Sequence, residues 1–255
     1  GFIVGTPSLP IDWTINSGYL VGPGANLAFA NLPEAKLTSL NLEGADLTGA
    51  YLIGANLVGA NLNGTKLYGA ILVDVQSGYI WGDPYLPSGW AIYNGYLLGA
   101  GANLMNAELS GIYLSGVSLE GANLSGANLT YANFARVNLS LANLVGANLD
   151  SALMVEVNLT KANLFQAILF NTTFIYSDLT GVNLERATLD GAILEGILTG
   201  VRSGNTVGAP AYLPREWTFQ NGYLIGPGAT LVDANLQDAY LGWVNLTGAN
   251  LRGAN

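Results

Sequence analysis

The chain has 255 residues, of which half are apolar and a tenth are charged, and its formal net charge at pH 7 is −9. Cysteine and histidine are both absent, so the sequence offers no disulfide framework, no thiolate or imidazole for catalysis and no usual zinc-ligand set. The negative charge has the wrong sign for general phosphate binding, and we therefore expect no direct nucleic-acid partner.

The chain opens with a block at residues 1–24 that predicts a short β-hairpin. The block holds the motif Leu-Pro-x-x-Trp, from Leu9 to Trp13, followed by Gly-Tyr-Leu. Two further copies of the block occupy residues 77–101 and 203–228. In both later copies Asn precedes the Gly, and Asn-Gly between aromatic and aliphatic residues is a strong signal for a hairpin turn. The first copy has the weaker Ser17-Gly18. We expect the Trp and Tyr of each hairpin to cover the edge of the structure that follows.

Each block is followed by a run of five-residue repeats with an apolar central residue, nearly always Leu. The runs are ten repeats from Leu27 to Leu72, nineteen from Leu104 to Leu194 and five from Leu231 to Leu251. Ala is the commonest residue two positions before the centre, Asn one position before it and Gly two positions after it. A period of five fits neither an α-helix nor a flat strand, and indicates a chain that turns a corner in every repeat.

The repeat also predicts which side chains are buried. Residues two apart on an extended segment share a face, so Ala and the central Leu should both point inward. The intervening Asn should point outward, where its side chain can bond the local backbone and form an amide ladder with the Asn of the next coil.

Departures from the repeat indicate how many repeats make one coil. Phe134, Met154 and Phe174 replace the central Leu at intervals of 20 residues, and the oppositely charged Asp46 and Lys66 have the same separation. Such residues would be direct neighbours if one coil contained four repeats. We therefore predict an all-β fold, a right-handed quadrilateral parallel β-helix (β-solenoid) with inserted hairpin blocks.

The blocks and runs divide the sequence into three modules. Module 1 is residues 1–76, with repeats in 25–74; module 2 is residues 77–202, with repeats in 102–199; and module 3 is residues 203–255, with repeats in 229–255. The uncharged segments 13–33 and 84–107 are interrupted by Gly, Pro and Asn, so we expect no membrane span. Since the chain begins without Met and stops inside a repeat, we interpret it as a fragment of a longer array or a processed product. A secreted, cell-surface or periplasmic location is therefore open.

The run of Ala-Asn-Leu-x-Gly units resembles the pentapeptide-repeat family over about two-thirds of the chain. The block Leu-Pro-x-x-Trp with Gly-Tyr-Leu-x-Gly-Pro-Gly-Ala is similar to one in multi-module members from cyanobacteria. The resemblance implies the right-handed quadrilateral β-helix. One branch of the family confers quinolone resistance by presenting to gyrase an acidic surface that mimics duplex DNA. Here the carboxylates of module 2 are scattered over several faces and mixed with Lys161 and Arg186.

Enzymatic chemistry would have to use carboxylate pairs, because no His or Cys is present. Glu185 and Asp190 lie on successive faces of the predicted coil and not in one cleft. We therefore expect no enzyme, and no catalytic, cofactor-binding or metal-binding residues.

Outward apolar residues are the candidate partner-binding residues. Phe165 and Phe170 follow central Leu residues and should face solvent on adjacent sides. Val145 should stack next to Phe165, and Ile175 should lie on a neighbouring face. Ordinary scatter of surface apolar residues is the alternative, whereas a contiguous patch would mark a partner site.

We thus predict a non-enzymatic β-solenoid that acts as a rigid scaffold or spacer. Its partner would be a protein, or a second copy stacked on an open coil end. The alternative is a DNA-mimic protein that binds a topoisomerase such as gyrase.

Overall fold

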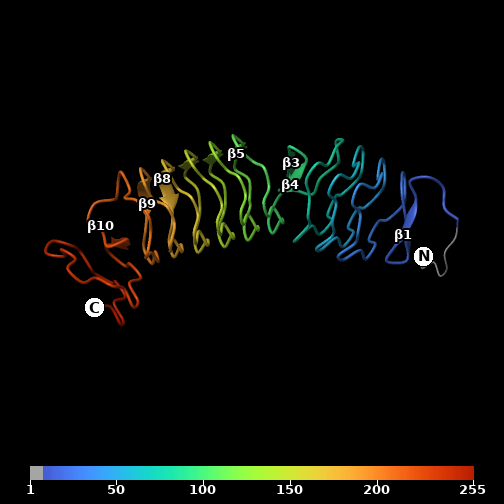
Figure 1. Ribbon diagram of the computed structural model, residues 1–255. Helices are drawn as coiled ribbons and strands as arrows, with labels where there is room; N and C mark the ends of the chain where they lie inside the picture. Colours follow the sequence, from blue (N-terminus) through green and yellow to red (C-terminus); the bar gives the residue numbers. More distant parts are fainter. Residues whose placement is uncertain (1–7) are drawn as a thin grey trace. The chain divides into compact units, whose positions relative to one another are not determined.

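The computed structural model describes residues 8–255, so residues 1–7 of the first hairpin block lie outside the described residues. By its internal contacts the chain divides into two compact units, Gly1–Leu104 (unit 1) and Met105–Asn255 (unit 2) (Figure 1). The three sequence modules were defined by motif and not by contacts, and they stay a prediction.

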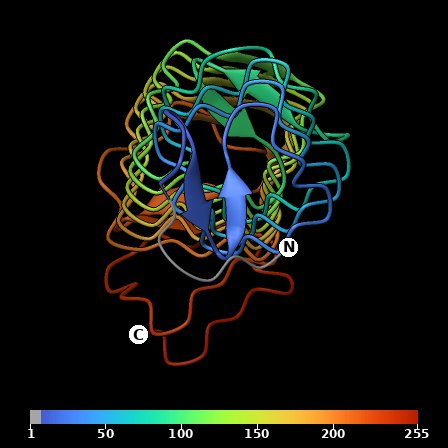
Figure 2. The same ribbon diagram turned by 90° about the vertical axis from the view of Figure 1, so that its right-hand side faces the viewer.

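Each unit is a right-handed, four-sided parallel β-helix with antiparallel hairpins inserted in it, as predicted. Parallel bridges join residues 20 apart, such as Asn41 with Asn61 in unit 1 and Asn123 with Asn143 in unit 2. The Leu124 N–H donates to the Asn143 carbonyl at 2.7 Å, and the Asn143 N–H donates back to the preceding coil. Figure 2 shows the coils of unit 1 nearly end-on, as four-sided loops.

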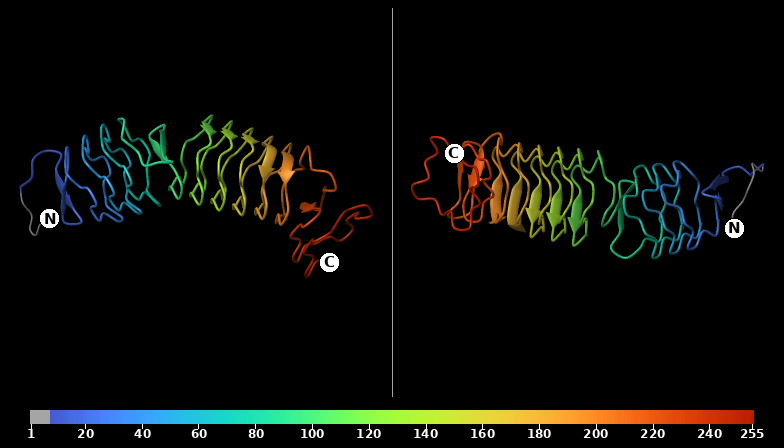
Figure 3. Two further views of the ribbon diagram at one scale, coloured as in Figure 1. Left: turned by 180° about the vertical axis from the view of Figure 1, so that it is seen from behind. Right: turned by 90° about the horizontal axis from the view of Figure 1, so that it is seen from below.

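One side of unit 2 is a five-stranded parallel sheet, whose strands lie side by side in Figure 3. The strands are β5 (Tyr113–Ser115), β6 (Asn133–Ala135), β7 (Leu153–Val155), β8 (Thr173–Asp178) and β9 (Ile193–Ile197). Phe134 pairs with Met154, and Met154 pairs with Phe174. The predicted coil of four repeats is therefore confirmed.

Each typical corner is a β-turn that begins at the central residue of a repeat. The Ala127 N–H donates to the Leu124 carbonyl at 3.0 Å, and the second of the two residues between them, Gly126, has a φ of 66°. This left-handed conformation is adopted by Gly without steric cost, which explains why Gly is commonest two positions after the centre.

The inward positions form the core. The central Leu residues of both long runs are buried, as are the Ala residues two positions before them. Where Thr65 or Thr172 replaces that Ala, its buried hydroxyl donates to a carbonyl of the preceding coil, at 2.7 Å in each case. The predicted inward and outward assignment is confirmed, and each buried Leu contributes about 1.5–3 kcal/mol.

All three predicted hairpins are present. They are β1 (Thr14–Asn16) with β2 (Tyr19–Val21), β3 (Ala91–Tyr93) with β4 (Tyr96–Leu98), and β10 (Thr218–Gln220) with β11 (Tyr223–Ile225). In the hairpin of β3 and β4 both turn residues have positive φ, 47° at Asn94 and 75° at Gly95, as a type I′ turn requires.

The hairpin aromatic residues cover the cores of the units, as predicted. Trp13, Tyr19 and Trp90 pack against the core of unit 1, and Trp217 packs against the C-terminal core of unit 2. Each Trp ring lies directly on a Gly nine residues later, as Trp90 does on Gly99, so a side chain at that Gly would collide with the ring.

The length of the coil changes at β8. The pairing of β8 with β9 shifts register between Ile175 and Ser177, and on the coil after the shift the bridged residues are 19 apart, as in Asn183 with Arg202. The spacing is 20 again at Thr230 with Asn250. The described residues contain no helix, and therefore none suited to crossing a bilayer.

Candidate interaction surface

Each repeat presents three outward positions: one before the central residue, one after it and two after it. Asn at the first position serves the fold. Asn123 Oδ1 accepts a hydrogen bond from the Ser125 N–H at 3.2 Å and another from Asn143 Nδ2 on the next coil, also at 3.2 Å. The predicted local bond and amide ladder are both confirmed. The other two outward positions are left to vary, so they carry the surface chemistry.

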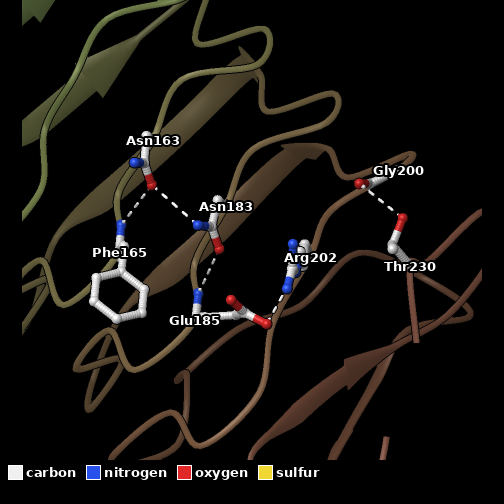
Figure 4. A network of polar contacts seen from close by, with 7 residues as sticks. All are labelled: Asn163, Phe165, Asn183, Glu185, Gly200, Arg202 and Thr230. Carbon is white, nitrogen blue, oxygen red and sulfur yellow. Dashed lines mark hydrogen bonds and ion pairs between the residues drawn. The ribbon is translucent and has the colours of Figure 1, made fainter. Parts of the chain in front are cut away.

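Figure 4 shows an amide ladder and its continuation in unit 2. Asn183 Nδ2 donates to Asn163 Oδ1 at 3.0 Å, and each oxygen also accepts a backbone N–H, from Phe165 and Glu185. On the next coil Arg202 stands in the Asn column, and its Nε donates to Glu185 Oε1 at 2.9 Å. Both side chains of this ion pair are partly exposed, and such surface pairs contribute at most about 1 kcal/mol.

Two of the four predicted partner-binding residues stack on one face of unit 2. Val145 and Phe165 each follow the central residue on successive coils, and the Gly146 N–H donates to the Phe165 carbonyl at 2.9 Å. The Phe165 ring is partly buried, and the Arg186 guanidinium lies over it at 5.7 Å from the ring centre. This cation–π contact stabilises one orientation of the ring.

The other two residues lie on the following faces. Phe170 is 40% exposed on the face after Phe165, and Ile175 lies in β8 beside Val155 of β7. The four predicted residues thus spread over three successive faces of unit 2, and their role as a partner site stays a prediction.

Unit 1 carries an apolar surface that our sequence reasoning missed. We call it the unit 1 patch, and it consists of Tyr51, Ile53, Tyr68, Ile71, Val73 and Tyr85. These side chains are between 37% and 51% exposed. Tyr51 and Ile71 are bridged across successive coils, and Ile53 and Val73 follow them by two positions on the same face, so the four form a square.

The tyrosines extend the patch around a corner. Tyr68 lies on the adjacent face, separated from Ile71 by two small residues of the turn, and its ring centre is 5.6 Å from that of Tyr85 on the next coil. The patch thus covers parts of two neighbouring faces. Its sequence signal was the pair of apolar residues at positions 51 and 71, where the repeat prefers Asn.

Charged groups border the patch on both sides. A shallow groove beyond Ile53 is lined by Glu34, Asp74 and Lys36, among others. On the opposite side, Lys66 Nζ lies 3.7 Å from Asp46 Oδ2. Hydrogen bonds from Thr48, with a smaller effect from the Lys66 charge, lower the pKa of Asp46.

Acidic residues of unit 2 do not form an unbroken column at the position after the central residue. Phe170 lies between Asp150 and Asp190 on successive coils. Glu185 lies on the face before Asp190 and pairs with Arg202. In residues 8–255 no group of three or more side chains could hold a metal ion.

Comparison with solved structures finds several similar proteins. HetL, a pentapeptide repeat protein involved in heterocyst differentiation regulation from the cyanobacterium Nostoc sp. strain PCC 7120, is 25% identical, with 90% of this chain and 88% of that chain covered and a TM-score of 0.32. Rfr23 from the cyanobacterium Cyanothece 51142 is 25% identical, with 62% and 91% covered and a TM-score of 0.14. Trypsin-treated QnrB1, a plasmid-mediated fluoroquinolone resistance protein, is 20% identical, with 68% and 86% covered and a TM-score of 0.29. No curated protein gives a match.

The family model described as pentapeptide repeats matches the chain in eight copies. The matched residues are 24–52, 45–76, 102–140, 132–171, 167–197 and 228–255. These segments cover well over half of the chain and coincide with the coils described above. The chain therefore belongs to the pentapeptide-repeat family.

Proposed function

We propose that this protein is a non-enzymatic scaffold that presents protein-binding surfaces on the rigid coils of a β-solenoid. One observation carries the proposal: the inward positions repeat the same apolar residues, while the chemical variety lies at outward positions. Side chains at those positions are held at fixed spacing, about 4.8 Å from coil to coil.

The exposed apolar residues support protein binding over a purely mechanical spacer. A spacer needs only solubility, which polar outward residues supply. The unit 1 patch instead exposes three tyrosines and three aliphatic side chains side by side, and Tyr is enriched at the centres of protein interfaces. The residues Val145, Phe165, Phe170 and Ile175 remain the candidates in unit 2.

Site-specific photocrosslinking tests the proposal. A benzophenone amino acid placed at Val73, at Phe165 or at the polar outward position Ser125 would report contacts on three different surfaces. We expect discrete crosslinked protein adducts at one apolar position and none at Ser125. The absence of adducts at both apolar positions, in an extract of the source organism, would contradict protein display.

Self-association is a second form of the proposal. A second copy could stack on a coil end, since unpaired backbone N–H and C=O groups at an open edge template further pairing. Chains that stay monomeric at high concentration by light scattering would refute end-to-end stacking.

The alternative is a DNA-mimic protein that binds a topoisomerase such as gyrase, which the net charge of −9 favours. Such mimicry would need carboxylates spaced along the solenoid like phosphates, and Phe170 breaks the column between Asp150 and Asp190. A gyrase supercoiling assay decides: no effect of the protein at micromolar concentration removes this alternative.

A further inference from the structure

We propose that the unit 1 patch is the docking surface for a protein segment that has a compact apolar face flanked by Lys or Arg side chains. This inference rests on the proposed function and names the surface and the partner chemistry. Two observations support it: the patch lacks hydrogen bonds that Asn side chains form in neighbouring repeats, and carboxylates lie at its edge.

Tyr51 and Ile71 lie one position before a central Leu, where most repeats have an Asn whose side chain forms hydrogen bonds within and between coils. At the equivalent position of neighbouring repeats, Asn61 Oδ1 accepts the Asn63 N–H at 2.9 Å and Asn61 Nδ2 donates to Asn41 Oδ1 at 2.9 Å. Neither Tyr51 nor Ile71 has an oxygen that could replace Asn Oδ1 in this bond. The chain thus forgoes both kinds of bond on two successive coils and exposes apolar surface there, which is costly for a soluble fold unless a partner covers it.

Two other departures from Asn in the same unit are offset within the fold. Lys66 replaces Asn but lies within ion-pair distance of Asp46, and Gln76 replaces Asn but accepts a hydrogen bond from Asn56 Nδ2 at 3.1 Å. Tyr51 and Ile71 have no such offset, and they are bridged to each other on successive coils, whereas Trp81 is bridged to Asn61 and Lys36 to Asn56. Their repetition on two coils is what favours an external contact.

The charged residues around the patch indicate that the partner should carry positive charge. In residues 8–104 there are six carboxylates and two ammonium groups, and Lys66 is already paired with Asp46. Glu34 and Asp74 stand at the same corner of the solenoid, two positions after their central residues, with φ of 53° and 57°. They flank the groove next to Ile53, where Lys36 is the cationic side chain. A partner with Lys or Arg beside its apolar face would meet an excess of negative charge.

Other occupants fit this surface less well. A second copy would bring the same acidic border against itself, and nucleic acid would meet carboxylates. A carbohydrate would use the Tyr68 and Tyr85 rings but would leave Ile53, Ile71 and Val73 unexplained. A second copy gives a distinct result in the test below.

The decisive variant restores the repeat. Tyr51→Asn with Ile71→Asn removes the centre of the patch and extends the amide column from Asn31, so the variant should keep or raise the melting temperature. The matched control is Ile168→Asn in unit 2, which is also an apolar residue in an Asn column, bridged to Asn148, and 40% exposed.

The probe is a short synthetic peptide in which Ile and Tyr alternate with Lys. Two comparison peptides have Glu in place of every Lys, or Ser in place of every Ile and Tyr. Binding is followed by fluorescence anisotropy at physiological salt. We expect the Lys peptide to bind the wild-type chain and the Ile168→Asn variant equally, and to lose about tenfold or more in affinity on Tyr51→Asn with Ile71→Asn. Glu34→Lys with Asp74→Lys should also weaken it, and both comparison peptides should bind more weakly.

Several outcomes would overturn the inference. Equal affinity of the Lys peptide for the patch variant and the wild type would exclude the patch as its binding site. If the Ser peptide binds as tightly as the Lys peptide, the binding comes from general charge attraction. A dimer that forms in the wild type and is lost in the patch variant, measured by light scattering, would assign the patch to a second copy. If the peptides fail while the chain crosslinks to protein through Phe165, only this inference falls and protein display stands.

Discussion

Replacing Leu144 by Asp tests the inward assignment on which the whole surface analysis depends. Leu144 has no exposed surface and lies at the centre of a coil whose neighbours on both sides also place Leu there. Removing a buried Leu side chain costs about 2–5 kcal/mol. Burying an uncompensated polar group adds about 1–3 kcal/mol. The sum is comparable to the roughly 5–15 kcal/mol that stabilises a typical domain, so the variant should lose its folded unit 2 under mild conditions.

The control is Ser125→Asp, at an outward and partly exposed position of the neighbouring coil, where a carboxylate stays in water. We expect a change within about 0.5 kcal/mol there. Urea denaturation should be followed by circular dichroism and by hydrogen exchange, because solenoid coils can unfold in stages. Burial raises the pKa of the new carboxyl, so the destabilisation of Leu144→Asp should grow as the pH rises above about 3.9, the ordinary Asp value. Equal urea midpoints for the two variants would refute the inward assignment.

Three further predictions concern single contacts. Thr172→Val removes a buried hydroxyl that donates to a carbonyl of the preceding coil at 2.7 Å, and should cost about 1–3 kcal/mol in urea denaturation. Gly99→Ala places a methyl group in the Trp90 ring and should lower the melting temperature, with a change in Trp fluorescence. The pKa of Asp46 lies below its ordinary value of 3.8, chiefly through a side-chain hydrogen bond with Thr48, so Thr48→Val should raise it in an NMR titration. Because this pKa is lowered in the folded state, the stability that Asp46 contributes is present above pH 3.8 and is lost as the pH falls through the lowered pKa.

Each of these predictions has a control or a contrary outcome. Thr173→Val alters an outward hydroxyl next to Thr172 and should be nearly neutral. Gly121→Ala meets open space and should cost only about 1 kcal/mol, from its left-handed φ of 63°. An unchanged Asp46 titration in Thr48→Val would show that the backbone N–H of Thr48, and not its hydroxyl, holds the carboxylate.

The coil geometry could be predicted from the sequence because the same five-residue pattern recurs in nearly every repeat. The departures at Phe134, Met154 and Phe174 gave the 20-residue period, and the pairing of β6, β7 and β8 confirms it. The hairpins could be predicted because Asn-Gly specifies a two-residue turn locally. Both signals depend on near neighbours in the chain.

The shift to 19-residue spacing could not be predicted in the same way. It depends on how β9 meets the coil before it, where Ser177 pairs with Gly196 after the register shift. The Ser177 side chain also accepts the Val157 N–H at 3.1 Å, a bond that the usual Ala cannot make. The only trace in the repeat pattern is that the next buried central residue, Leu198, follows Leu194 by four residues instead of five, and our frame of repeats ended at Leu194.

The interaction surface was partly missed for a related reason. Outward residues were judged in the long run of unit 2, where Phe165 and Phe170 stand out by size, while Tyr51 and Ile71 look like two isolated substitutions in unit 1. The coil brings them together, and only the hydrogen bonds of the neighbouring Asn columns show what they forgo. Thr172 departs from the usual Ala, but its hydroxyl forms a hydrogen bond within the solenoid, so this departure has a structural reason. A departure without such an offset, repeated on the next coil, is where binding should be sought, since the stability given up inside the protein can be recovered only through an external contact.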